Sequence, residues 1–254
     1  MAGLLREARP AALVKLSVNV NKVATIRNSR GGAVPSVLDA VEVCLRAGAP
    51  GITVHPRGDA RHITAEDTRR VGELVARWGG GAEFNIEGDP RPDLIDLVVA
   101  VRPTQCTLVP VMPGEITSQA GWGPDTPAAV TATVARLRSL GIRVSLFVDP
   151  EAEAIRWAAG AGADRIELYT EPFARAFERG DGHASFSVYA RAAELAHELG
   201  LAVNAGHDLD LSNLGMFRLL PYLAEVSIGH ALVSHALFVG LERSVKDYLA
   251  ALKG

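Results

Sequence analysis

Short runs of apolar, often β-branched residues alternate along the chain with longer segments whose apolar positions recur every three or four residues. The first pattern is typical of buried strands and the second of amphipathic helices. Strand and helix patterns succeed each other roughly every 25 to 35 residues, which indicates eight consecutive β-α units. The expected strands are 16–20, 51–55, 83–87, 106–109, 144–148, 165–169, 202–204 and 225–228.

Turn chemistry and strand composition together predict how these units are arranged. A glycine closes the helical pattern before several strands, as in "RAGAPGITVH" and "SLGIRVSLFVD". The strands are almost wholly apolar, which implies burial on both faces and a parallel sheet covered by helices. A doubly wound open sheet would need a glycine-rich phosphate fingerprint after the first strand, where the sequence instead is "SVNVNKVATIRNSRGG". We therefore predict an α/β fold, a (β/α)8 TIM barrel with eight parallel strands and outer helices.

No linker divides the chain, so we expect a single barrel domain over 1–254. The longer irregular stretches are 25–35, 56–63 and 110–127, and all of them follow strands, where a barrel has the loops of its catalytic face. The glycines and prolines of 110–127 fit either a lid over the site or a static loop.

Composition narrows the class of protein and its partners. The chain has 254 residues, 48% hydrophobic and 22% charged, enough to fill one large core. A net charge of -3 gives no reason to expect nucleic acid or an anionic membrane as partner. Cys44 and Cys106 lie in helix and strand patterns and are expected to be small buried hydrophobes. Neither a signal peptide nor an apolar run of about 18 residues is evident, so we expect a cytoplasmic protein that is not anchored in a membrane.

Reactive polar side chains gather at the carboxyl ends of the expected strands, where barrel enzymes place their active sites. Three of the seven histidines, His55, His207 and His230, lie there, whereas chance would place about one. A lone histidine is often a hydrogen-bonded structural residue, but three converging on one mouth favour function. The strand-end candidates also include Asn19, Asn21, Arg57, Asn85, Glu87, Asp149, Glu167, Asn204 and Gly229.

Histidine and a desolvated carboxyl group suit proton transfer near neutral pH. Glu87 ends an apolar strand and is the natural base, although it could instead pair with a mouth arginine such as Arg57. Gly229 and His230 stand where the last strand turns into a helix, whose free N-H groups favour a phosphate. Arg30 in the first loop could bind the same anion, or could simply be solvated.

Several segments of the chain together resemble one enzyme family. "VNVNKVATIRNSRGG", "AGAPGITVHPRGDARHIT", "FNIE", "VSLFVD", "VNAGHDL" and "IGHAL" occur in the order and spacing of the pyridoxine 5'-phosphate synthase family, almost end to end. The resemblance implies a (β/α)8 barrel, usually a homo-octamer, that works without metal or organic cofactor. It also implies condensation of 3-amino-2-oxopropyl phosphate with 1-deoxy-D-xylulose 5-phosphate into pyridoxine 5'-phosphate, phosphate and water.

The resemblance also implies roles for individual residues. His55 and Glu87 match the proton acceptors of the family, and His207 matches its proton donor. The positions that hold the amino-ketone phosphate are matched by Asn19, Arg30, Gly229 and His230, and those that hold the xylulose phosphate by Arg57, His62 and Thr117.

The chain departs from the family pattern within the site. Asn21 and Lys22 stand where the family usually has Asp-His, and Asp208 stands where it usually has glycine. The loop "VPVMPGEIT" lacks the usual basic pair, and "SHAL" replaces "GRA" near the last helix. A carboxylate at Asp208 would repel a phosphate dianion. We therefore keep the hypothesis that one substrate differs, either lacking a phosphate or carrying an amine that pairs with Asp208.

Two other classes of function remain as alternatives. A metal-dependent barrel hydrolase would also place histidines and carboxylates at strand ends, but the first strand carries Asn-Val-Asn rather than His-x-His and no HExxH spacing occurs. A degenerate paralogue could bind a phosphorylated metabolite without turnover, but it would not require His55, Glu87 and His207 together. We therefore predict a ring-forming transferase that acts on phosphorylated small molecules and assembles as a homo-oligomer.

Overall fold

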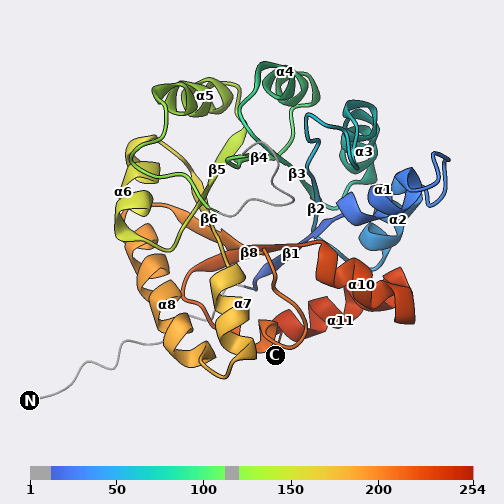
Figure 1. Ribbon diagram of the computed structural model, residues 1–254. Helices are drawn as coiled ribbons and strands as arrows, with labels where there is room; N and C mark the ends of the chain where they lie inside the picture. Colours follow the sequence, from blue (N-terminus) through green and yellow to red (C-terminus); the bar gives the residue numbers. More distant parts are fainter. Residues whose placement is uncertain (1–12, 112–119, 254) are drawn as a thin grey trace, which may run out of the picture.

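Eight parallel strands form a closed barrel in the order of the sequence, as predicted (Figure 1). The computed structural model describes residues 13–111 and 120–253. Neighbouring strands pair in parallel all the way round, and β1 pairs with β8. The strands are β1 Lys15–Asn19, β2 Gly51–Val54, β3 Glu83–Gly88, β4 Gln105–Leu108, β5 Arg143–Val148, β6 Arg165–Leu168, β7 Ala202–Ala205 and β8 Leu223–Ile228.

Helices surround the barrel, and within the described residues β1, β6 and β8 are each followed by two helices rather than one (Figure 1). The sequence pattern had indicated one helical segment after each strand. The helices are α1 Asn21–Asn28, α2 Val37–Arg46, α3 Ala65–Trp78, α4 Pro92–Val101, α5 Ala128–Ser139, α6 Ala152–Gly160, α7 Glu171–Glu178, α8 Gly182–Glu198, α9 Leu214–Phe217, α10 His230–Val239 and α11 Leu241–Lys253.

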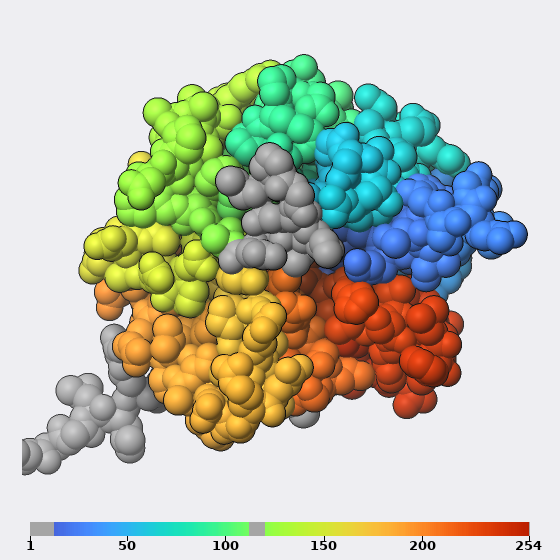
Figure 2. Space-filling view, in the orientation of Figure 1, coloured from blue at the N-terminus to red at the C-terminus, as the bar shows by residue number. Residues whose placement is uncertain are grey.

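The first and the last strand meet where the barrel closes. Leu16 and Val18 of β1 stand in register with Val226 and Ile228 of β8. Figure 2 accordingly shows the first helices, in blue, directly beside α10 and α11, in red. Because closure pairs β1 with β8, neither strand is left as an unpaired sheet edge.

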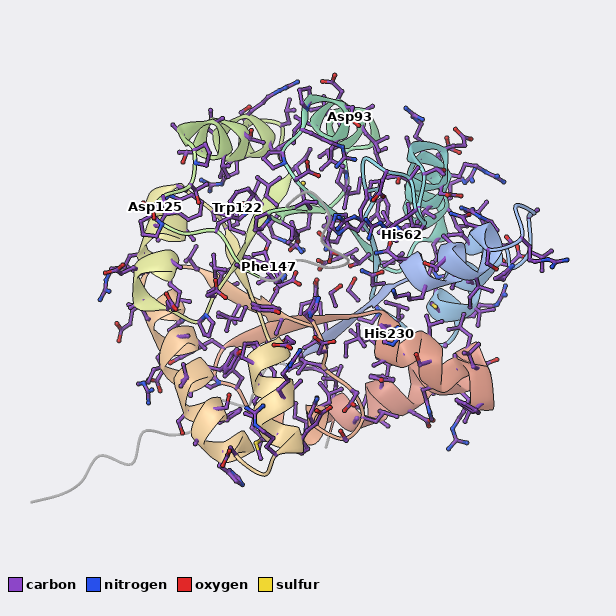
Figure 3. All side chains as sticks on the ribbon, in the orientation of Figure 1. His62, Asp93, Trp122, Asp125, Phe147 and His230 are labelled. Atoms are coloured by element: carbon purple, nitrogen blue, oxygen red, sulfur yellow. The ribbon has the colours of Figure 1, made fainter. Side chains whose placement is uncertain are left out.

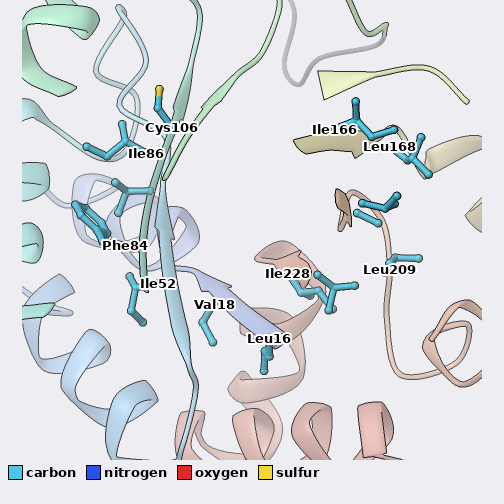
Figure 4. Close-up of a cluster of buried hydrophobic side chains, with 14 of the residues drawn as sticks. Leu16, Val18, Ile52, Phe84, Ile86, Cys106, Ile166, Leu168, Leu209 and Ile228 are labelled. Carbon is cyan, nitrogen blue, oxygen red and sulfur yellow. The ribbon is translucent and has the colours of Figure 1, made fainter. Parts of the chain in front are cut away.

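The outward-facing side chains of the strands form the main hydrophobic core. Leu16, Ile52, Ile86 and Ile166 are completely buried and belong to one cluster with the helix side chains (Figure 4). Alternate residues of a strand point to opposite faces, so this single set covers the helix-facing side of the barrel. Cys44 and Cys106 are buried in the same cluster as free thiols, as predicted.

Many inward-facing side chains are polar, which corrects the prediction that the strands are almost wholly apolar. The Ser17 and Thr53 hydroxyls lie 2.6 Å apart, Asn85 Nδ2 donates to Thr53 at 3.3 Å, and the Thr107 hydroxyl donates to Asn85 at 3.0 Å. All four side chains are buried. Burial of polar groups is tolerated here because neighbouring strands satisfy one another's hydrogen bonds.

An ionic network occupies the amino ends of the strands, opposite the expected site. Glu83 pairs with Lys15 and with Arg143, whose Nε donates to Gln105 at 2.9 Å. These contacts join four strands of the barrel at the end that barrel proteins use for stability rather than catalysis.

The first predicted loop is partly helical, so the prediction of an irregular 25–35 was wrong at its start. Helix α1 extends to Asn28 because Val23 and Ala24 are buried against the barrel. Its last turn is fixed by Arg27, which donates to both carboxylate oxygens of Asp67 at 2.6 and 2.9 Å. The stretch 56–63 has no helix or strand, as predicted, and residues 112–119 of the stretch 110–127 lie outside the described residues. In the part of the chain that is described, no helix is both long and apolar enough to cross a membrane.

Candidate active site

A cavity of about 710 Å³ opens at the carboxyl ends of the strands. Figure 3 shows His62, Phe147 and His230 around this opening, contributed by the loop after β2, by β5 and by the start of α10. Most of the residues singled out from the sequence line it: Asn19, Asn21, Lys22, His55, Arg57, His62, Glu87, Glu167, His207, Asp208, Gly229 and His230.

Glu87 is a buried carboxyl group held by neutral hydrogen-bond donors. Asn19 Nδ2 lies 3.4 Å from Oε2, and Asn85 Nδ2 and the Ser227 hydroxyl lie 3.5 and 3.3 Å from Oε1. Burial raises the pKa of Glu87 to about 7, although the hydrogen bond from Ser227 acts in the opposite direction. Near neutral pH this carboxyl group can therefore both accept and release a proton.

Glu167 lies beside Glu87 inside the barrel and is buried as well. Burial raises its pKa well above the usual value, and the negative charges of Glu87 and Glu225 raise it further. Two carboxyl groups that share a desolvated space do not both ionise readily. Glu167 is thus the group that holds its proton.

His55 begins the loop after β2 and faces Glu87, with 3.9 Å between its Nδ1 and Glu87 Oε2. Its Nε2 is buried and has no hydrogen-bond partner among the described residues. Burial lowers the pKa of His55 to about 3, with contributions from His62 and Arg57. The ring is therefore neutral and carries a lone pair for accepting a proton.

Asn21 fixes the backbone at His55. Its side-chain Oδ1 accepts from the His55 N–H at 2.9 Å, while its own N–H donates to Asn19 Oδ1 at 3.0 Å. An asparagine and an aspartate both offer this acceptor oxygen. The amide thus keeps the hydrogen bond that a carboxylate would make.

A second part of the cavity carries positive charge. Lys22 and Arg57 line this part together with His62. Burial lowers the pKa of His62 to about 4, and the positive charges of Lys22 and Arg57 lower it as well. The Nδ1 of His62 accepts from the N–H of Ile63 at 2.9 Å. Nε2 of His62 then carries the ring proton and can act as a hydrogen-bond donor.

His207 follows β7 and pairs with its neighbour, since 2.8 Å separates His207 Nδ1 from Asp208 Oδ2. The hydrogen bond to His207 lowers the pKa of Asp208. The His207 ring packs edge-on against Tyr169 and Phe147, with centroid distances of 5.4 and 6.5 Å. This aromatic wall fixes the plane of the imidazole.

Two glycines allow the strand ends to approach each other at the mouth. A Cβ on Gly206 would lie 2.0 Å from the carbonyl oxygen of Ser227, and one on Gly229 would lie 3.1 Å from Asn19. Gly229 precedes α10, whose first residue is His230. Gly229, His230 and Ala231 line the cavity, so the start of α10 borders it, and the free N–H groups of a helix start favour an anion.

Comparison with known proteins identifies the family. The family model described as pyridoxal phosphate biosynthesis protein PdxJ matches residues 16–254. The chain belongs to the PdxJ family. It is therefore an enzyme, as the sequence predicted.

Curated relatives of the family match nearly the whole chain. A pyridoxine 5'-phosphate synthase of Christiangramia forsetii is 51% identical over 245 residues, covering 95% of this chain and 100% of the relative. A pyridoxine 5'-phosphate synthase of Leptospira biflexa is 50% identical over 253 residues, covering 94% of this chain and 97% of the relative.

Solved structures with little sequence identity share the barrel. Thiamine phosphate pyrophosphorylase from Pyrococcus furiosus has a TM-score of 0.62 at 13% identity and covers 94% of this chain and 96% of its own. Phosphoribosyl anthranilate isomerase from Thermotoga maritima has a TM-score of 0.60 at 13% identity and covers 95% and 99%. These similarities show the fold alone.

Five residues that the sequence linked to the site are not among the described residues that line the cavity: Arg30, Asn85, Thr117, Asp149 and Asn204. Arg30 is exposed in the turn after α1, away from the lining residues. Thr117 lies outside the described residues. The phosphate contact of Arg30 stays a prediction.

Other lining residues were missed by the sequence reasoning. Phe147 and Ser227 are inward-facing strand residues, and the alternation of β5 and β8 could have found them. Arg175 comes from α7, whose position over the mouth has no local sequence signal. Within the described residues, no group of three or more His, Cys, Asp or Glu side chains is arranged to hold a metal ion.

Proposed function

We propose that this enzyme condenses 3-amino-2-oxopropyl phosphate with 1-deoxy-D-xylulose 5-phosphate into pyridoxine 5'-phosphate, phosphate and water by acid–base catalysis. The observation that carries the proposal is the convergence of His55, Glu87 and His207 on one cavity. Curated relatives about 50% identical to this chain are named for the same product.

The protonation states of the three groups suit their proposed roles. A neutral His55 and a Glu87 with a pKa of about 7 accept protons from the carbon acids, and His207 donates protons to leaving oxygens. Addition of an amine to a ketone, loss of water and ring closure each require a proton transfer. One cavity that holds all three groups lets these steps follow one another without release of intermediates.

The two substrate phosphates are assigned to opposite parts of the cavity. The start of α10 at Gly229 and His230, together with Asn19, suits the amino-ketone phosphate. Lys22, Arg57 and His62 suit the xylulose phosphate. Lys22 supplies positive charge in a chain whose loop after β4 lacks the basic pair usual in the family.

One observation favours a second candidate, in which the partner bound at the α10 end lacks a phosphate. Asp208 lines this end, and its side chain is 44% exposed. The charge of this carboxylate would repel a phosphate and attract an amine. Turnover of Asp208→Gly with both phosphorylated substrates tests this candidate, because no gain over the wild-type protein contradicts it.

The proposed function is tested by incubating the purified chain with both substrates and detecting pyridoxine 5'-phosphate by mass spectrometry. The expected result is product and inorganic phosphate in equal amounts, abolished in His207→Ala. Absence of product from folded wild-type protein would overturn the proposal. The same assay with unphosphorylated amines or ketones would then identify the second candidate.

A further inference from the structure

The carboxylate of Asp208 lies against the imidazole of His207. Asp208 has a φ of +61°, in the left-handed region that residues other than glycine seldom adopt. The side chain of Asn213 stabilises this turn. Its Nδ2 donates to the Asp208 carbonyl at 3.2 Å, and its Oδ1 accepts from the Asp210 N–H at 3.0 Å. This backbone conformation directs the Asp208 carboxylate back to His207 Nδ1, 2.8 Å away.

The remaining contacts of His207 fix the ring relative to that carboxylate. Thr170 donates to the His207 carbonyl, and Tyr169 and Phe147 pack edge-on against the ring. Since Asp208 engages Nδ1, a proton that the ring gives to a substrate leaves from Nε2.

We propose that Asp208 is a positioning residue, whose carboxylate holds Nδ1–H of His207 so that the imidazolium delivers its proton from Nε2 into the cavity. This inference rests on the proposed function, in which His207 is the proton donor.

The effect of the Asp208 charge has to be separated from that of its neighbours. The groups of other elements that interact electrostatically with His207 or Asp208 are Glu87 of β3, Tyr169 after β6, Arg175 of α7 and His230 of α10. All of them are unchanged in a variant of Asp208 alone. A difference between the variant and the wild-type protein therefore reports the Asp208 charge.

The first experiment measures kcat and KM for the wild-type chain, Asp208→Asn and Asp208→Gly. Asparagine and glycine both tolerate a left-handed backbone, so both variants should fold. Asp208→Asn keeps an acceptor oxygen without its charge and should lower kcat about 10-fold, with KM for the amino-ketone phosphate within about 3-fold, because a hydrogen bond to a charged group is lost. Asp208→Gly removes the acceptor altogether and should lower kcat at least as far. An unchanged kcat, with or without a lower KM, would overturn the proposal.

A second experiment needs no turnover and separates this inference from the proposed function. Diethyl pyrocarbonate modification of His207 is followed by peptide mass spectrometry at one fixed pH, with exposed His183 of α8 as internal control. The rate of His207 modification should rise in Asp208→Gly, because the carboxylate no longer occupies Nδ1, while the rate for His183 stays the same. Such a rise over a wild-type protein that makes no product would overturn the function and leave the dyad standing. Equal His207 rates in the two proteins would overturn the dyad.

Discussion

At the residue scale, the site combines uncharged imidazole rings with buried carboxyl groups whose pKa values are raised. Burial lowers the pKa of His55 to about 3 and raises that of Glu87 to about 7. The same desolvation thus prepares one base and one group that exchanges protons at neutral pH. Burial and the charge of Glu87 also raise the pKa of Glu167, so this group does not add a second negative charge next to Glu87.

The raised pKa of Glu87 makes the stability of the protein depend on pH. Burial favours the protonated form in the folded state, so this contribution to stability is fully present below the unfolded pKa of about 4.5. It is lost as pH rises through about 7. We expect the free energy of unfolding of the wild-type protein to fall between these values by about 1 to 3 kcal/mol more than that of Glu87→Gln. Urea denaturation against pH measures the difference, and parallel curves would contradict it.

Asn21 provides a test of backbone positioning at His55. Asn21→Asp retains the oxygen that accepts from the His55 N–H, and it should keep kcat within about 3-fold. Asn21→Leu removes that acceptor and leaves the His55 N–H unpaired. The free-energy cost of one unpaired buried donor corresponds to a kcat about 10- to 100-fold lower. Steady-state kinetics compares the two variants. Equal losses would show that the hydrogen bond does not position His55.

Much of the site could be predicted from single residues. His55, Glu87 and His207 are polar residues at the ends of apolar strands, so their strand positions alone brought them to one mouth. The pairing of His207 with Asp208 could not be predicted, because it depends on a left-handed backbone at Asp208. For Arg30 the sequence left two alternatives open, an anion contact or a solvated side chain, and in the structure the side chain is exposed.

At the scale of the elements, alternation along each strand separates the core from the chemistry. Outward residues such as Ile52 pack on helices, and inward residues such as Thr53 form hydrogen bonds with neighbouring strands. The sequence predicted the strands within one or two residues because their apolar runs are short and bounded by glycine turns. The polar interior was missed because small hydroxyl residues like Ser17 and Thr107 hardly interrupt an apolar run.

A substitution at Gly206 tests how closely β7 approaches β8. Gly206→Ala would place a Cβ 2.0 Å from the Ser227 carbonyl oxygen, which belongs to the backbone and cannot rotate away. We expect a loss of about 3 kcal/mol or more of unfolding free energy. Gly215→Ala in α9 is the matched control, because nothing lies within 4 Å of its Cβ, and it should stay within about 1 kcal/mol of the wild-type protein. Urea denaturation that gives equal effects would contradict the close approach.

At the scale of the whole molecule, apolar surface remains uncovered at the end of α10. Leu237 and Phe238 are 70% and 89% exposed. Such residues support the proposal that the enzyme is a homo-oligomer, an octamer by family resemblance. Replacing both by aspartate should give smaller assemblies in light scattering with an unchanged circular dichroism spectrum. The matched control is Leu13→Asp, an exposed position at the start of the described chain that should leave the assembly intact.

The central claim is that His55, Glu87 and His207 act together on the two phosphorylated substrates in one cavity. The most direct measurement is pyridoxine 5'-phosphate formation by the wild-type chain and by His55→Ala, Glu87→Gln and His207→Ala under the same conditions. We predict product from the wild-type protein and a kcat lower by about 10² to 10⁴ in each variant, with KM little changed. Folded variants that retain wild-type kcat, or a wild-type protein that forms no product, would contradict the account.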